Sequence, residues 1–339
     1  MARLAGVSSA TVSRVLNGSG TVSEAHRHKV LRAVETLDYH PNAGARTLAS
    51  GRSTQIGLLV SDICNPFFAE LAKSIERAAL QSGFEVMLSE TDYDSERLNK
   101  ALRRFLERSV AGVMVMASEL ELDLVDRLAR RGVPLVLLDL ESRWPRTSTV
   151  RVDYARGIDE AVRHLAALGH RRLAFIGGPR GIASAATRVD AFTRAVERHI
   201  GASHVARSHE ADFQLEGGFK AAVDILAGRP RPTAVLAAND WMAMGILKAC
   251  RTQGLRVPRD ISIVGFDDIA FAKLTDPPLS TVCLPRDELG RRAVEALMLS
   301  LQAHSDHPPE VQVPTHFVPR GTTGPALGAG VRSAALTAV

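Results

Sequence analysis

Hydrophobic and polar positions follow two rhythms along this chain, one confined to about the first forty residues and one that begins near residue 55. In the first stretch, the apolar residues from Val7 to Leu16 fall at helical spacing, and the polar residues between them are small or planar hydrogen-bonding types. Gly6, Val7 and Ser8 predict a turn, with Ser8 as the N-cap of a helix that reaches about Leu16.

A further helix is predicted to begin after Ser23, a residue type that caps helices well. Its apolar positions from Val30 to Leu37 keep the i, i+3, i+4, i+7 pattern of one helix face. Two helices joined by a tight turn and followed by a third are typical of a helix-turn-helix. The helix before the turn has only Met1–Ala5, so we expect it to be truncated.

A short polar segment follows, from His40 to Thr54. Pro41 ends the preceding helix, and Asn42 is a candidate cap for a new one over residues 43–49. Such a helix has barely two turns and contains Gly44, so it is marginal alone in water and needs a partner to form.

From residue 55 onward, apolar runs that end in small or polar residues alternate with helical segments. This order is typical of βαβ units, in which parallel strands are covered on both faces. The length of the region predicts two such lobes, and we expect the Gly- and Ala-rich residues 325–339 to be disordered. The predicted strands are QIGLLVSD from Gln55, FEVMLSE, GVMVMA, PLVLLD, RLAFIGG, TAVLAAND and ISIVGFDD, and a helix is predicted from Pro66 to Ser82.

The positive charge of the chain is concentrated at its start. The formal net charge is +5, and residues 1–52 hold seven Lys or Arg against Glu24, Glu35 and Asp38, which leaves +4 in this segment. A concentrated basic segment is typical of a protein that binds a phosphate backbone.

Composition narrows the protein class further. The three cysteines, Cys64, Cys250 and Cys283, are sparse and odd in number, which favours a reducing compartment over a disulfide framework. No apolar run reaches the ~18 residues of a membrane span, and the start lacks the apolar core of a secretory signal. We therefore expect a cytoplasmic protein with no membrane partner.

The helix after Ser8 carries side chains suited to DNA. A helix-turn-helix places the N-terminal residues of its second helix at base edges in the major groove. Hydroxyl groups there contact phosphates or bases, Arg14 can form a bidentate pair with guanine, and Ala10 can meet a thymine methyl group. The alternative is an ordinary amphipathic helix whose polar face is only solvated.

Six segments in order carry a family resemblance. They are the stretch from GVSSATVSRVLNG to DICNPFFAEL, then HLAALGHRRLAFIGGP, PTAVLAANDWMAMG, LRVPRDISIVGFDD, PPLSTVCLPRDELG and FVPRGTTGP. Together they span residues 2 to about 325, and they resemble the lactose/galactose-repressor (LacI/GalR) family of bacterial transcriptional regulators.

The resemblance implies an α/β protein that acts as a homodimer. Its parts are a three-helix helix-turn-helix headpiece (1–41), a hinge helix (42–52) and a two-lobed periplasmic-binding-protein-like domain of doubly wound parallel sheets (53–324). The N-lobe is expected over 53–153 and 285–315, and the C-lobe over 154–284. Ser9 and Ala10 match the positions that set operator preference, and Leu48 matches a leucine that wedges into a minor-groove step. The implied DNA-binding residues are Ser8, Ser9, Ala10, Thr11, Ser13, Arg14, Asn17, Asn42, Arg46 and Leu48.

The implied effector pocket lies between the lobes, where the strands of open α/β sheets end. Acids and amides at strand ends suit a hydroxyl-rich ligand, and aromatic rings supply an apolar wall. The implied effector-binding residues are Ser61, Asn65, Phe67, Phe68, Asp139, Arg188, Phe213, Asn239 and Asp267.

For several of these residues a structural role is the alternative to ligand binding. Arg188 and Asp267 could instead form a salt bridge that closes the lobes, and Phe67 is as well explained as a residue of the hydrophobic core. Asp240 is expected to cap the helix Trp241–Arg251 rather than touch a ligand. Trp241 would either stack on a ligand or pack between the lobes.

Some positions depart from the family pattern, which leaves the ligand class open. Leu140 follows Asp139 where Arg is frequent, Tyr154 stands where Asn is common, and Cys64 stands where Ser or Asn is common. The expected effector is a sugar or sugar derivative, and whether it releases the protein from DNA or acts as co-repressor is not decided by these residues.

Two other functions fit the sequence less well. A periplasmic sugar carrier would need a secretory signal and would have no use for a basic headpiece. An enzyme would need a nucleophile, base or metal set, and GxxxxGK[ST], HExxH, GxSxG and CxxC are all absent from the sequence. We therefore expect a ligand-responsive repressor with no cofactor, no metal and no catalytic residue. Its partners would be a pseudo-palindromic operator, a small-molecule effector and a second copy of the chain, in a bacterial cytoplasm and on the nucleoid when bound to its operator.

Overall fold

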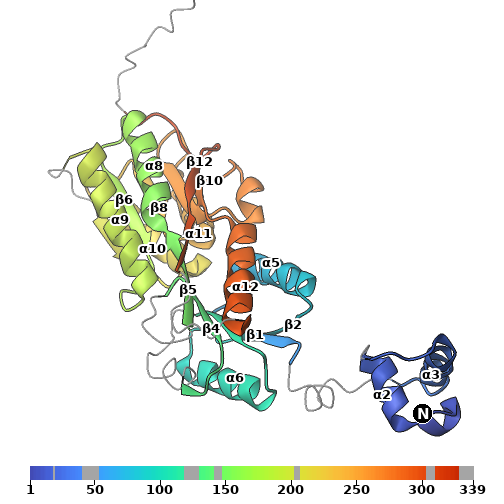
Figure 1. Ribbon diagram of the computed structural model, residues 1–339. Coiled ribbons are helices and arrows are strands. Elements are labelled where there is room, and N and C mark those ends of the chain that lie inside the picture. The colour runs from blue at the N-terminus through green and yellow to red at the C-terminus, as the bar shows by residue number, and fades with distance from the viewer. Residues whose placement is uncertain are drawn as a thin grey trace, which may run out of the picture. The chain divides into compact units, whose positions relative to one another are not determined.

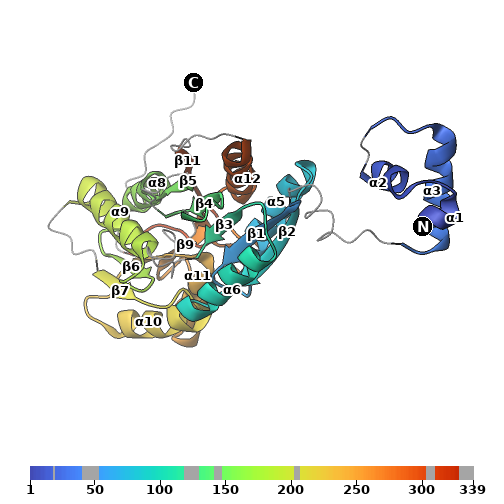
Figure 2. The same ribbon diagram turned by 60° about the horizontal axis from the view of Figure 1, so that its bottom comes forward.

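The computed structural model describes residues 1–17, 20–39, 53–117, 130–140, 147–201, 207–302 and 310–327. The chain divides into two compact units, Met1–Thr54 and Gln55–Val339, which are treated separately below. Figures 1 and 2 show the elements of each unit from two directions. The predicted hinge helix, with Asn42, Arg46 and Leu48, lies outside the described residues.

The first unit contains three helices around a small apolar core. They are α1 (Ala2–Ala5), α2 (Ser9–Asn17) and α3 (Glu24–Thr36). Gly6 ends α1 in the left-handed conformation with φ of 64°, which glycine adopts without steric cost. Ser8 accepts the N–H of Thr11, and Ser23 accepts the N–H of His26, so both predicted caps are confirmed. The buried core residues are Ala5, Val12, Val15, Val30 and Ala33.

The second unit is built on two six-stranded sheets. The first sheet has the order β11-β5-β4-β3-β1-β2, and the second has the order β12-β10-β9-β8-β6-β7. Neighbouring strands run parallel except for β10 and β12, which are antiparallel. The strands are β1 (Gln55–Val60), β2 (Glu85–Glu90), β3 (Val113–Met116), β4 (Leu135–Leu138), β5 (Thr147–Asp153), β6 (Leu173–Gly177), β7 (Arg207–Glu210), β8 (Ala234–Ala237), β9 (Ser262–Asp267), β10 (Ser280–Cys283), β11 (Val311–Pro314) and β12 (His316–Val318).

Helices cover both faces of each sheet, as the continuous apolar runs of the strands require. On the first sheet, α5 and α12 pack together on one face, and α6 packs on the other. On the second sheet, α8 and α9 lie on one face and α10 and α11 on the other. The helices are α5 (Pro66–Gln81), α6 (Ser95–Glu107), α8 (Tyr154–Ala167), α9 (Ala183–His199), α10 (Leu215–Ala227), α11 (Asp240–Thr252) and α12 (Arg286–Gln302), with a short 3-10 helix η1 (Ala270–Lys273).

Strand β1 shows how the sequence pattern builds this arrangement. Successive side chains of a strand point to opposite faces. Ile56, Leu58 and Val60 therefore enter the core beneath α5, whereas Leu59 enters the core beneath α6. This two-sheet α/β architecture with an N-terminal helix-turn-helix confirms the expected fold class.

The chain passes between the two sheets three times within the described residues, and each sheet with its helices forms one lobe. The first passage joins β5 to α8, the second joins β10 to α12, and the third joins β11 to β12 through Thr315. At the first and third passages, Gly157 donates its N–H to Thr315 Oγ1, and Thr315 donates to the carbonyl of Asp153. These bonds fix the first turn of α8 against the crossing strands.

The structure adds strands to those read from the sequence and moves one boundary. The added strands are β5, β7, β10, β11 and β12, and β7 is a polar edge strand of sequence RSHE that no hydrophobic pattern marks. Ala326 is buried and donates its N–H to the carbonyl of Leu168. The folded domain therefore extends past residue 324, where the disordered tail was expected to follow. Residues 328–339 lie outside the described part of the chain.

Candidate functional site

The exposed face of α2 holds the side chains predicted to meet DNA. Val12 and Val15 turn into the core of the first unit, whereas Ser9, Ala10 and Arg14 are exposed. Ser8 and Ser13 are also exposed, and Thr11 is half-buried with its hydroxyl 2.9 Å from that of Ser8. Asn17 is the last residue of α2, and its side chain lies outside what the structure describes. The helix therefore presents a face of hydroxyls and one guanidinium opposite its apolar face.

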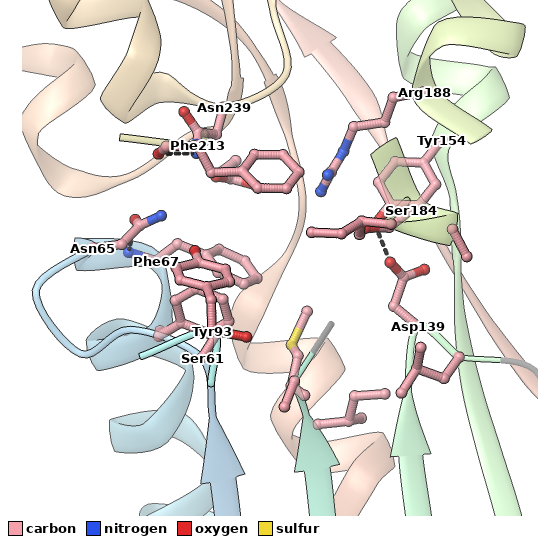
Figure 3. A pocket seen from close by; sticks show the side chains of 18 residues that line it. Ser61, Asn65, Phe67, Tyr93, Asp139, Tyr154, Ser184, Arg188, Phe213 and Asn239 are labelled. Atoms are coloured by element: carbon pink, nitrogen blue, oxygen red, sulfur yellow. Dashed lines mark hydrogen bonds between the residues drawn. The ribbon is translucent and has the colours of Figure 1, made fainter. Parts of the chain in front are cut away.

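A pocket between the two lobes collects all nine predicted effector-binding residues (Figure 3). The space within it measures about 620 Å³, part of it open to solvent. Its lining comes from the carboxyl ends of strands in both sheets, as open α/β sheets favour. The nine residues are Ser61, Asn65, Phe67, Phe68, Asp139, Arg188, Phe213, Asn239 and Asp267.

Arg188 is the central cation of this pocket, and aromatic rings hold it instead of acids. Its guanidinium carbon lies 4.4 Å from the ring centre of Tyr154 and 5.1 Å from that of Phe266. The residue is buried, its Nε has no hydrogen-bond partner, and no described acid lies within ion-pairing distance. The alternative of a salt bridge between Arg188 and Asp267 is therefore wrong for this structure.

Two carboxyl groups in the pocket bind protons more strongly than usual. Burial raises the pKa of Asp139 to about 6, against the opposing effects of the Arg188 charge and of a hydrogen bond from the Tyr154 hydroxyl. Burial also raises the pKa of Asp267 to about 7, although Arg188 and Arg286 oppose the shift. Burial of the Asp267 carboxyl costs free energy of desolvation, which a hydrogen-bond donor on a ligand would offset.

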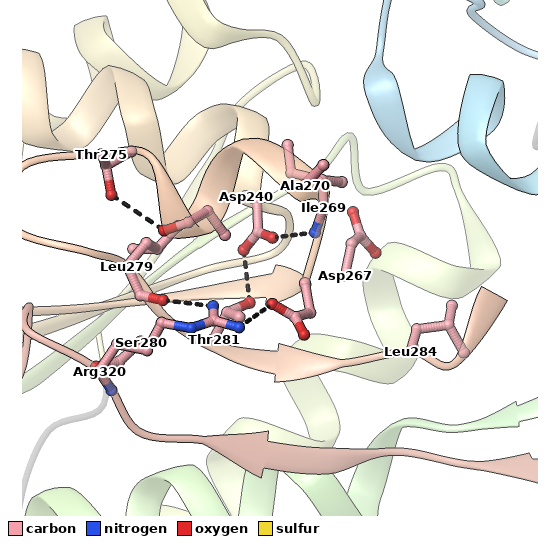
Figure 4. A network of polar contacts seen from close by, with 12 residues as sticks. Asp240, Asp267, Ile269, Ala270, Thr275, Leu279, Ser280, Thr281, Leu284 and Arg320 are labelled. Carbon is pink, nitrogen blue, oxygen red and sulfur yellow. Dashed lines mark hydrogen bonds and ion pairs between the residues drawn. The ribbon is translucent and has the colours of Figure 1, made fainter.

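The residue that caps α11 is Asn239, the neighbour of the residue expected to do so. Asn239, not Asp240, caps α11 by accepting the N–H of Met242 at 2.7 Å, so the predicted cap was wrong. Asn239 also donates to the carbonyl of Phe213, so its amide shapes the pocket wall. Asp240 is fully buried and accepts the N–H of Ile269 and the hydroxyl of Thr281 (Figure 4).

The segment from Asp267 to Ala270 is held from several sides. Asp267 and Asp268 have φ of 108° and 57°, left-handed values that cost free energy for a residue other than glycine. Arg286 donates to the backbone carbonyls of both, and Arg320 pairs with the Asp268 carboxylate. These bonds, together with the contact of Asp240 to Ile269, aim the Asp267 side chain into the pocket.

Polar contacts near the pocket also connect the lobes. Glu70 on α5 accepts the N–H of Ala270 at 2.9 Å and pairs with Arg286 Nε at 2.9 Å. Gln214 donates to Asp62 at 2.8 Å across the cleft. A change in the angle between the lobes would alter or break these contacts.

The pocket contains nine further residues, most of them apolar. Leu140 and Tyr154 were noticed only as departures from the family pattern. The others lie at or just after strand ends or at the start of α9, which the sequence pattern marks in a general way. Except for Tyr93 and Ser184 their side chains are apolar and carry no chemical signal. Trp241 is not among the lining residues and packs against the main core, whereas Phe67 is both nearly buried and part of the lining. The further residues are Tyr93, Met116, Ala117, Leu138, Leu140, Tyr154, Ile182, Ala183 and Ser184.

Two negative observations apply to the described residues. Their acidic, histidine and cysteine side chains form no cluster of three or more that would hold a metal ion. None of the helices in the described ranges combines the length and apolar character that crossing a bilayer requires.

Comparison with known proteins places the chain in a family. Residues 1–42 match the model for bacterial regulatory proteins of the lacI family, and residues 162–323 match a periplasmic binding protein-like domain. The transcriptional repressor PurR of Photobacterium profundum is 35% identical over 299 residues, which cover 88% of this chain and 90% of that protein. The chain belongs to the lacI family.

Two further members of the lacI family support this assignment over most of the chain. The ribose operon repressor of Escherichia coli is 35% identical over 301 residues, which cover 88% of this chain and 91% of that protein. The crystal structure of the Lac repressor dimer bound to operator and an anti-inducer superposes with a TM-score of 0.85 and 31% identity. It covers 95% of this chain and 97% of that one.

Proposed function

We propose that this protein represses transcription as a dimer on a pseudo-palindromic operator, and that a small molecule in the pocket between the lobes modulates its affinity for DNA. The proposal rests on two features of the same chain, the exposed polar face of α2 and a pocket whose buried Arg188 pairs with no described acid and has an unbonded Nε. The relatives are repressors, and one solved relative is a dimer bound to operator.

The proposed DNA contacts come from α2 and the hinge. Ser9 and Ala10 are proposed to read base edges in the major groove, and Arg14 to contact a guanine or a phosphate. Leu48 is proposed to wedge into a minor-groove step, and Asn42 and Arg46 are proposed to contact DNA. Ser8, Thr11, Ser13 and Asn17 are proposed to contact the backbone or brace the motif.

The proposed effector is a sugar or sugar derivative, bound by the nine predicted residues. The carboxyl group of Asp267 and the guanidinium of Arg188 offer hydrogen bonds, and the Phe67, Phe68 and Phe213 rings offer apolar walls. The ribose operon repressor among the relatives is consistent with a ligand of this class. We propose no catalytic role, since the relatives are repressors, and we place the protein in the cytoplasm with the DNA it regulates.

Coupling requires that the ligand bind two conformations of the protein unequally. A ligand between the lobes would favour one arrangement of the contacts of Glu70 and Gln214, and so one relative position of the lobes. In a dimer, that position would set the spacing of the two headpieces.

The test is a gel-shift titration of the purified chain against the upstream region of its own gene, at several salt concentrations. We expect a sequence-preferring shift whose affinity falls steeply with salt. The Arg14→Ala variant should weaken the shift by roughly tenfold or more. Arg194→Ala removes the same charge from an exposed position of α9 and should leave the shift unchanged. The absence of a sequence preference under every condition, with and without candidate ligands, would refute the proposal.

A further inference from the structure

Tyr154 joins the two lobes at one end of the pocket. It is the first residue of α8, directly after the strand of the first sheet that leads into the second lobe. Its hydroxyl donates to the carboxylate of Asp139, which follows β4 in the first sheet. Its ring contacts Arg188 and lies 5.4 Å from the ring of Phe266 in the second sheet. Figure 3 shows Tyr154, Asp139 and Arg188 together on one side of the pocket.

This position is rigid. Tyr154 is 2% exposed, and the bonds of Thr315 fix the first turn of α8. A Cβ at Gly157, one turn further along α8, would lie 2.3 Å from Val282, so the helix sits directly on the strands beneath it. Burial of the ring and the packed first turn of α8 hold the phenol ring in this place.

The hydroxyl of Tyr154 occupies the place at Asp139 where a sugar hydroxyl would donate. A carboxylate in a pocket recognises a polyol by accepting its hydroxyl protons, and Asp139 already accepts one from within the protein. The neighbours of Asp139 in the lining, Leu138 and Leu140, are apolar. Directly beside Asp139 the lining therefore offers a ligand carbon surface, and the Asp139 carboxylate is occupied by the Tyr154 hydroxyl.

The ring of Tyr154 has the opposite effect on Arg188. It holds the guanidinium by its face, which leaves the N–H groups at the edge free of any described acid. Arg188 thus stays available to an oxygen acceptor on the ligand, and Asp267 stays available to a donor. The groups that remain available for hydrogen bonds to a ligand are therefore Arg188 and Asp267, whereas Asp139 already accepts the Tyr154 hydroxyl.

We propose that Tyr154 is a specificity-determining residue that withdraws Asp139 from ligand binding, so that the pocket prefers a sugar derivative bearing an apolar, deoxygenated end over the fully hydroxylated sugar. This inference rests on the proposed function only in assuming that the pocket binds a ligand. Binding is measured directly, so its outcome is separate from that of the operator assay.

The experiment measures binding by titration calorimetry for two pairs of probes, D-ribose with 5-deoxy-D-ribose and D-galactose with 6-deoxy-D-galactose. The proteins are the full-length wild type, Tyr154→Phe, Asp139→Asn and the double variant. Tyr154→Phe keeps the ring beneath Arg188 and removes only the hydroxyl, so Asp139 becomes free to accept a ligand hydroxyl. Relative to wild type, it should bind at least one hydroxylated probe about tenfold or more tightly and lower the preference for its deoxy partner.

The cycle of variants separates this role from a merely structural one. Asp139→Asn should change sugar affinity less in the wild-type background than in the Tyr154→Phe background, because the wild-type carboxylate already accepts the Tyr154 hydroxyl. In the Tyr154→Phe background, the same change should abolish the gain. The proposal is wrong if the four proteins bind each probe with the same affinity, or if none of them binds any probe. It is also wrong if the increase in affinity caused by Tyr154→Phe persists when Asp139→Asn is added. Retained operator binding by each variant checks that it is folded.

Discussion

Replacing Asp267 with Asn should stabilise the protein without ligand, and increasingly so as the pH rises. Asp267 is 3% exposed. Arg286 bonds to its backbone carbonyl and not to its side chain, and no other described donor bonds to its carboxyl oxygens. Its pKa of about 7 in the folded chain lies above the ordinary value of 3.8. The charged form is therefore disfavoured by folding, and Asn removes that charge at almost constant shape.

The sign and size follow from proton linkage. Between the two pKa values the folded state holds more protons than the unfolded state, so the contribution of Asp267 to stability is full below the lower value and is lost as the pH rises through about 7. From pH 5 to that pKa is about two units, and each unit corresponds to about 1.4 kcal/mol. Between pH 5 and pH 8, wild type should therefore lose about 2–3 kcal/mol that Asp267→Asn retains.

The assay is urea unfolding at pH 5 and pH 8, at one protein concentration because the dimer equilibrium contributes to stability. The quantity compared is the difference in unfolding free energy between variant and wild type at the two pH values. Asp224→Asn makes the same chemical change at an exposed position of α10 and should show no such pH dependence. Equal differences at pH 5 and pH 8 for Asp267→Asn would refute the view that a buried, unpaired carboxyl is kept there at the expense of stability.

Three further changes test other parts of the account. Arg188→Ala should weaken binding of the effector by roughly tenfold to a hundredfold in calorimetry, because its hydrogen bonds to the ligand are lost, while operator affinity without ligand is retained. Loss of both together would mean that the residue acts through folding. Leu48→Ala should weaken operator binding by on the order of tenfold in a gel shift and leave effector affinity intact, as expected if it acts as a wedge; an equal loss of both would contradict that role. Ser23→Ala should lower the protection of α3 amides in hydrogen exchange by about 1 kcal/mol, because one helix cap is removed, and unchanged protection would show that the cap contributes nothing.

Much of the fold follows from local patterns. Buried parallel strands are continuous apolar runs, so β1, β3 and β9 are readable without a structure, and Ser8 and Ser23 mark helix starts by their hydroxyls. The edge strand β7 carries no such run, because its polar sequence is stabilised by pairing with β6 and not by its own composition.

The pocket was predictable in outline, because strand ends and the family resemblance both point to it. What the sequence did not reveal is how its side chains pair. Asn239 and Asp240 are adjacent and both able to cap a helix, and only the position of Ile269 and Thr281 in space makes Asp240 a bridge to η1 and β10. The substitution at Tyr154 was visible as an oddity, but its bond to Asp139 and its place beneath Arg188 depend on three separate elements meeting.

The central claim is that the pocket and the DNA-binding face are coupled. It is tested most directly by fluorescence anisotropy of a labelled operator, titrated with the protein in the absence and presence of a ligand. The ligand is chosen by thermal-shift screening as one that stabilises the wild type but not Arg188→Ala. The account predicts that the ligand changes the operator dissociation constant by a factor of about 5 or more, and that operator DNA changes the ligand dissociation constant by the same factor. A ligand that saturates the pocket and leaves the operator dissociation constant unchanged would contradict it.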